Sequence, residues 1–241
     1  DWRFKYVPAV DAPADADFHR LDFDASSWVT IPVPGHWELH GFAAPSYAEV
    51  EAGTGMYRHA FHVPPDWRGQ RVMLRFDGVL YGLHVWINGK SVGSWASSFN
   101  PVTFDITDAL VAGEEQLVAV KVTTRSKGWE FDTMDCWALS GIFRDVSVFA
   151  VPATHLKDFT WSTRIEPDGS ARARLAVATS APGNGLVRLL APDGRLQHEF
   201  AFATAASDVA SEEFLIARPQ QWTAETPALY TLELTLGEGE G

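Results

Sequence analysis

Apolar and polar residues alternate along most of the chain before Pro152, and a period of two is typical of β-strands with one buried face. This alternation predicts strands within residues 57–63, 71–76, 102–106, 116–123 and 142–149. Residues 83–87 and 90–95 flank Asn88-Gly89. Because both positions of a tight hairpin turn require positive φ, this dipeptide predicts a β-hairpin. Residues 107–110 have room for a short helical turn only.

A second series of strand patterns follows Pro152, where the composition also shifts, because eight of the ten tryptophans precede this point. The predicted strands fall within residues 159–165, 171–178, 186–190, 196–202, 209–216 and 230–236, with glycine-containing turns between them. This spacing and a length of about 90 residues are typical of an immunoglobulin-like sandwich. The longer loops of the first part favour a jelly roll. We therefore predict an all-β protein with a jelly-roll β-sandwich over residues 1–151 and an immunoglobulin-like β-sandwich over residues 152–241.

Composition and charge narrow the classes of partner. The 241 residues are 46% hydrophobic and carry a net charge of −12, so neither nucleic acid nor an anionic membrane is an expected partner. No apolar run approaches the ~20 residues that span a bilayer. Cys136 is the single cysteine, which is more typical of a small buried hydrophobe than of a nucleophile. With no leader-like N-terminus, this favours the cytoplasm. The start at Asp1 and the Gly-Glu-Gly-Glu-Gly end suggest a piece of a longer protein.

Carboxylates interleaved with aromatic residues are the strongest candidate chemistry. Glu130, Asp132 and Asp135 lie among Trp129, Phe131 and Trp137. Aromatic faces stack on the C–H faces of sugars, and carboxylates accept hydrogen bonds from sugar hydroxyls. The alternative is a solvated loop with Trp137 packed in the core. Glu49 and Glu51, beside Tyr47, form a weaker candidate of the same kind.

Histidine spacing gives little indication of a metal site. His36 and His40 are four residues apart, but no glutamate follows His36 and Pro34-Gly35 precedes it. This differs from the helical zinc motif with the same spacing. We therefore interpret both as loop histidines.

Several segments share their order and residue pattern with a known family. They are P-G-H-W-E-L-H-G-F at residues 34–42, T-G-M-Y-R at 54–58, F-D-G-V at 76–79, H-V-W-I-N-G at 84–89, D-C-W-A-L-S-G-I-F-R-D-V at 135–146 and P-Q-Q-W-T-A-E-T-P-A-L-Y at 219–230. Together they resemble the N-terminal part of bacterial β-galactosidases of glycoside hydrolase family 2. The S-G-I-F-R pattern favours the galactosidase branch over the related β-glucuronidases.

The resemblance implies a jelly roll, then an immunoglobulin-like domain, then a catalytic (β/α)₈ barrel that these residues do not include. It assigns no catalytic residue to this chain, which we expect to be inactive alone. It implies that Asp135 reaches the barrel's active site, binds galactosyl hydroxyls and ligates a sodium ion, with magnesium as the alternative ion, in the intact enzyme only. Glu49 stands where β-galactosidases often place an Asn beside the sugar, so it can accept but not donate as an amide would.

Two functional hypotheses follow. The first is the non-catalytic N-terminal part of a retaining β-galactosidase-like enzyme, which scaffolds the barrel of the same polypeptide, contributes Asp135 and Glu49 to the site for a β-galactoside or related sugar, and supports homo-oligomer contacts. Trp37, Trp86 and Trp137 are then core or loop anchors, and Arg144 and Asp145 hold the loop. The alternative is a free-standing carbohydrate-binding module that uses Trp129, Phe131 and Trp137 as its stacking surface.

Overall fold

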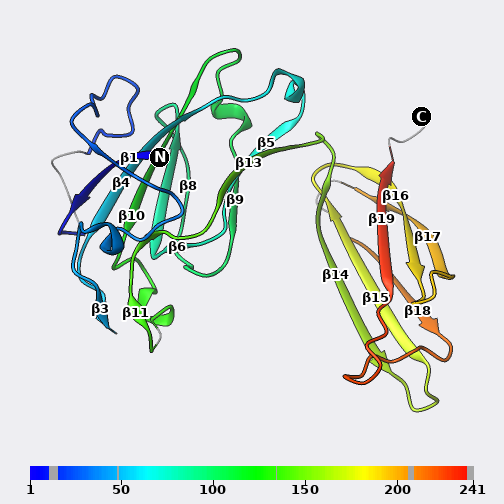
Figure 1. Ribbon diagram of the computed structural model, residues 1–241. Helices are drawn as coiled ribbons and strands as arrows, with labels where there is room; N and C mark the ends of the chain where they lie inside the picture. Colours follow the sequence, from blue (N-terminus) through cyan, green and yellow to red (C-terminus); the bar gives the residue numbers. More distant parts are fainter. Residues whose placement is uncertain (11–15, 48, 134, 206–208, 238–241) are drawn as a thin grey trace. The chain divides into compact units, whose positions relative to one another are not determined.

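The computed structural model describes residues 1–10, 16–47, 49–133, 135–205 and 209–237 and divides into two units, Asp1–Ala150 and Val151–Gly241 (Figure 1). Strands dominate both units. The helical segments among the described residues are short 3-10 turns: Glu38–His40, Pro65–Trp67, Thr107–Ala109 and Trp129–Phe131. None of the helices in this part of the chain has the length and apolarity to cross a membrane. The predicted all-β class is confirmed, and the division lies one residue before the predicted boundary.

Two main sheets build the first unit. One contains, in spatial order, β2 (Val29–Ile31), β1 (Trp2–Val7), β4 (Thr54–Phe61), β10 (Gln116–Thr123), β7 (Gly82–Ile87) and β8 (Lys90–Trp95). The other contains β13 (Val146–Val151), β5 (Arg71–Phe76) and β9 (Val102–Asp105). Two small ladders join loops at the edge of the unit: β3 (Ser46–Tyr47) with β11 (Trp137–Ala138), and β6 (Val79–Leu80) with β12 (Gly141–Ile142).

The hydrophobic core of the first unit lies between its two main sheets. Val85 and Val120 of the larger sheet share one buried cluster with Leu74 and Phe76 of the smaller sheet. Successive side chains of a strand point to opposite faces. The residues that alternate with the buried ones in each strand, such as Lys121 next to Val120, therefore lie on the other face of the larger sheet. The alternation in the sequence therefore reflects a sandwich with one shared core and one outer face on its larger sheet.

The predicted hairpin is confirmed, and one predicted strand is wrong in part. β7 pairs with β8, and Asn88 and Gly89 have φ of 50° and 81°, as a tight hairpin turn requires. The strand predicted over residues 142–149 is instead interrupted: β12 ends at Ile142, and β13 begins at Val146. Between them Arg144 donates to the carbonyl oxygen of Phe99 at 3.0 Å, so these residues serve loop contacts.

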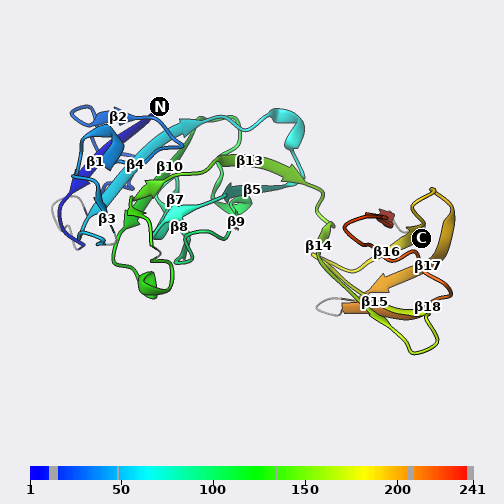
Figure 2. The same cartoon turned by 60° about the horizontal axis from the view of Figure 1, so that its bottom comes forward.

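The second unit contains two three-stranded sheets (Figure 2). Their orders are β14 (Leu156–Ile165), β15 (Ala171–Thr179), β18 (Val209–Ile216) and β17 (Leu196–Thr204), β16 (Gly183–Leu190), β19 (Thr231–Gly237). Leu175 and Val177 of β15 pack with Val187 of β16 and Phe202 of β17 in one buried cluster. The two sheets therefore enclose a core of their own.

Candidate functional site

Asp135 lies just before the short β3–β11 ladder at the edge of the first unit. Tyr47 of β3 is paired with Trp137 of β11, and their rings meet edge to face with centroids 6.0 Å apart. The Tyr47 hydroxyl donates to Asp135 Oδ1 at 2.5 Å, and this hydrogen bond raises the pKa of Tyr47. Asp135 is exposed, so a ligand can approach its carboxylate from solvent. β3 and β11 lie side by side in Figure 1.

A buried cluster anchors this ladder to the body of the unit. Ala138, next to Trp137, packs with Val50, Leu80 and Tyr81, and Trp129 covers the same cluster from its edge. Apolar burial on one side of the ladder restricts its movement. The exposed side chains of Tyr47 and Asp135 therefore extend from a part of the backbone that the buried cluster holds in place.

The loop at residues 34–42 braces the segment that follows Asp135. The Trp37 amide donates to the Ser140 carbonyl at 3.2 Å, and the Ser140 amide donates to Glu38 Oε2 at 2.9 Å. The Gly35 amide donates to the carbonyl of Ile142 at 2.8 Å. The two most recognisable segments of the sequence therefore bind each other, although about 100 residues separate them.

The three acids of the predicted cluster have three different environments. Asp135 accepts from Tyr47, as described above. Asp132 accepts from both the amide and the hydroxyl of Ser98, at 2.9 and 2.8 Å, so it stabilises a loop. Glu130 is exposed. Asp132 therefore has a structural role, whereas Glu130 and Asp135 are exposed. Of these two, Asp135 is the one held in a defined orientation.

Glu49 is exposed two residues after Tyr47. Together with Glu38 and Glu51 it lines a crevice of only about 10 Å³, which has room for about one water molecule. A sugar cannot enter this crevice. Glu49 can therefore reach a ligand only from its solvent side, and its crevice does not include Asp135.

The structure corrects two interpretations from the sequence. Trp37 is buried, as predicted, but Trp137 is 58% exposed and lies outside the core, so of its two predicted roles, core or loop anchor, the first is wrong. Its place in β11 turns the ring outward, because the neighbouring Ala138 takes the buried face. Cys136 is also exposed, contrary to the prediction of a buried thiol. Arg144 holds the loop as predicted: it donates to the carbonyl oxygens of Phe99 and Asp77.

The pairing of Tyr47 with Asp135 and the role of Glu38 were not predicted from the sequence. Tyr47 orients Asp135 from 88 positions away, and no local pattern encodes such a pair. Glu38 is a buried carboxylate, although its sequence position in a loop suggests a solvated side chain. The co-occurrence of both family-like segments was the only available signal.

Asp135 is the side chain that we expect to ligate the sodium ion. Within the part of the chain that the structure describes, no group of three His, Cys, Asp or Glu side chains is placed to hold a metal. Hard cations take several oxygen ligands, and the exposed Asp135 carboxylate has the right chemistry for one of them.

The buried carboxyl of Glu38 should make the stability of the fold depend on pH. Burial raises the pKa of Glu38 above its ordinary value of 4.5, against the opposing effect of the Ser140 amide. A raised pKa in the folded state contributes stability below the unfolded value, and this contribution is lost as pH rises through the folded pKa. We therefore compare the free energy of unfolding of the wild type with that of a Glu38→Gln variant. The wild-type value minus the variant value should fall as pH rises from below 4.5.

This expectation is tested by urea unfolding of both proteins at a series of pH values. The Glu51→Gln variant, which changes an exposed glutamate of the neighbouring loop, controls for the loss of one charge. A difference between the wild type and Glu38→Gln that stays constant with pH would contradict the assignment.

Family models match both units. A model described as glycosyl hydrolases family 2, sugar binding domain, matches residues 1–152, and a model described as glycosyl hydrolases family 2 matches residues 154–241.

Curated relatives match over the whole chain. It is 31% identical over 269 residues to a β-galactosidase of Psychromonas ingrahamii and 32% identical over 265 residues to one of Vibrio vulnificus. Each match covers 100% of this chain and 26% of the relative. The chain thus spans about a quarter of the length of these proteins.

Solved structures show the same fold. A Bacteroides uniformis β-glucuronidase superimposes with a TM-score of 0.80 at 26% identity, covering 98% of this chain and 29% of that one. A Bifidobacterium dentium β-glucuronidase superimposes with a TM-score of 0.77 at 21% identity, covering 100% and 44%. With family models over both units and relatives along its full length, the chain belongs to glycosyl hydrolase family 2.

Proposed function

We propose that this chain is the non-catalytic N-terminal part of a β-galactosidase-like retaining glycoside hydrolase, and that it contributes Asp135 to the site that binds the galactosyl unit. The observation that carries the proposal is the presentation of Asp135: an exposed carboxylate, oriented by Tyr47, just before a ladder that is anchored to a buried cluster. A carboxylate that served only the fold would be expected to have its hydrogen bonds satisfied internally, as Asp132 does with Ser98.

The chemistry of Asp135 fits the binding of a sugar. Its Oδ1 atom is fixed by Tyr47, and its exposed carboxylate can accept from a sugar hydroxyl or ligate a hard cation. A bound sodium ion would supply positive charge toward the sugar hydroxyls. Asp135 would be its single ligand from the described residues, and a barrel in the same polypeptide would supply the others and the two catalytic carboxylates.

Glu49 is the second residue we assign to sugar contact. It is exposed and follows Tyr47 closely in the chain, so it lies near the end of the same ladder. As a carboxylate it accepts hydrogen bonds and donates none. This selects for ligand hydroxyls that can donate toward it.

The proposal is tested on the enzyme encoded by the complete gene. The coding sequence should carry a (β/α)₈ pattern with two glutamates after this region. The enzyme should hydrolyse p-nitrophenyl β-galactoside with a kcat/KM at least about tenfold above that for the matching β-glucuronide, since even one lost hydroxyl contact is worth that much. Equal or reversed preference would overturn the galactoside assignment, and absence of a barrel would overturn the enzyme assignment.

The exposed aromatic side chains support a second candidate, a carbohydrate-binding module. Phe131 is 92% exposed, and Trp137, later in the same segment, is 58% exposed. Trp129, the third ring of the predicted stacking surface, packs against the buried cluster instead. Titration of the 241-residue chain with galactose and lactose separates the two: millimolar binding that is lost in Trp137→Ala favours the module, and its absence favours the scaffold.

A further inference from the structure

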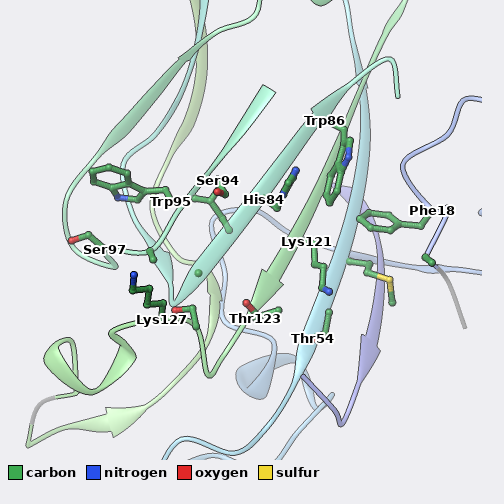
Figure 3. Close-up of a pocket in the computed structure, with 16 residues that line it drawn as sticks. Phe18, Thr54, His84, Trp86, Ser94, Trp95, Ser97, Lys121, Thr123 and Lys127 are labelled. Carbon is green, nitrogen blue, oxygen red and sulfur yellow. The ribbon is translucent and has the colours of Figure 1, made fainter. Parts of the chain in front are cut away.

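The outer face of the larger sheet in the first unit carries a hollow of about 860 Å³ (Figure 3). Residues of β4, β7, β8 and β10 form its floor, and Ser126 and Lys127 close one side. This volume is within the range of sites that bind small molecules. Gly82 permits the close approach of this side, because a Cβ atom there would lie 2.3 Å from the Ser126 Cβ.

Aromatic rings define two walls of the hollow. Trp86 is stacked on His84, with centroids 4.1 Å apart, and on His19 at 5.0 Å, so its ring is held in place. Trp95 is 39% exposed and lines the hollow from β8, and Figure 3 shows it on the opposite side from Trp86. The fixed ring of Trp86 and the accessible ring of Trp95 together suit a ligand that has both apolar and polar groups.

The charge of the hollow is opposite to that of the chain. Lys121 and Lys127 line it, and no aspartate or glutamate among the described residues does so, although the chain has a net charge of −12. Lys121 also lies close enough to lower the pKa of His84, after the larger effect of burial. Two ammonium groups without a lining carboxylate favour a ligand that carries negative charge.

Hydroxyl groups supply the remaining polar surface. Ser94, Ser97 and Thr123 line the hollow around the two lysines. The Ser126 hydroxyl, on the side wall, is buried, so the hydroxyl contacts to a ligand fall to these three residues.

We propose that this hollow binds a sugar that carries a carboxylate or a sulfate group. The accessible ring of Trp95 suits the C–H face of a pyranose, the hydroxyls suit its hydroxyls, and either ammonium group suits its single anionic group. A polyphosphate or nucleic acid fits less well, because the acidic remainder of the chain repels an extended polyanion. The inference uses different residues from Asp135 and goes beyond the proposed function.

The test is a titration of the ¹⁵N-labelled 241-residue chain at low salt with three probes. Methyl β-glucuronide and glucose 6-sulfate carry the anionic group, and methyl β-glucoside is the matched neutral sugar. We expect at least one anionic probe to bind about tenfold more tightly than the glucoside, and we expect about 0.5 M salt to remove most of this difference. The largest amide shifts should fall in β7, β8 and β10.

Variants locate the site. Lys121→Gln with Lys127→Gln should abolish the preference for the anionic probes, while Trp95→Ala should weaken binding of all three. Lys90→Gln, which changes a lysine of β8 that does not line the hollow, should leave binding unchanged. Circular dichroism checks that each variant is folded. Equal affinity for charged and neutral probes, no binding at all, or shifts centred on Asp135 would each overturn the inference.

Discussion

Replacing Asp135 by alanine in the intact glycosidase is expected to lower kcat/KM for a β-galactoside about 100-fold, because a well-placed contact to the transition state is worth a few kcal/mol. The variant removes an exposed carboxylate whose only described hydrogen bond is to Tyr47, so the stability of the fold should change little. The loss should therefore appear in kinetics and not in unfolding. Steady-state rates with p-nitrophenyl β-galactoside measure it.

Two conservative variants separate a binding role from a structural one. Asp135→Asn keeps an acceptor oxygen but loses the charge, so it should recover part of the activity. If Asp135 ligates sodium, this variant should also weaken the response of the rate to added sodium. Tyr47→Phe frees Asp135 without removing it and should have a smaller effect than Asp135→Ala. Near-normal kinetics in Asp135→Ala would remove Asp135 from the sugar site.

Strands and turns could be predicted because their signals are local. The alternation of residues 116–123 corresponds to β10 at both ends, and Asn88-Gly89 forms the expected turn. The prediction was wrong where tertiary contacts decide the backbone. Residues 143–145 lie within the strand predicted over residues 142–149, yet they leave the sheet, and Arg144 donates to loop carbonyls. A pattern of period two cannot distinguish such a segment from a strand.

The candidate site could be predicted only in its residue types. The sequence placed Glu130, Asp132 and Asp135 together, but burial and partners assign them different environments, and both depend on residues far along the chain. Ser98 satisfies Asp132, and Tyr47 orients Asp135. Trp37 and Trp137 illustrate the same limit, because both lie in family-like segments, yet only Trp37 is buried.

Replacing Trp37 by alanine is expected to destabilise the first unit by about 3–5 kcal/mol, the usual cost of truncating a large buried aromatic side chain. Trp37 is 1% exposed. Its ring stacks on Phe4 with centroids 6.1 Å apart and lies 5.5 Å from that of Tyr6. Gly55 makes room for it, since a Cβ atom there would lie 2.5 Å from the Trp37 ring. Such close packing leaves little means of filling the cavity.

The matched control is Trp137→Ala, which removes an equally large but exposed ring and should change stability by no more than about 0.5 kcal/mol. Hydrogen exchange of the amides of β4 and β10 reports the first unit separately from the second. Because Trp37 also donates its amide to the Ser140 carbonyl, loss of its ring should loosen the segment that follows Asp135 before the sheet itself opens. Equal protection in the two variants would show that the loop at residues 34–42 is not part of the core that holds the site.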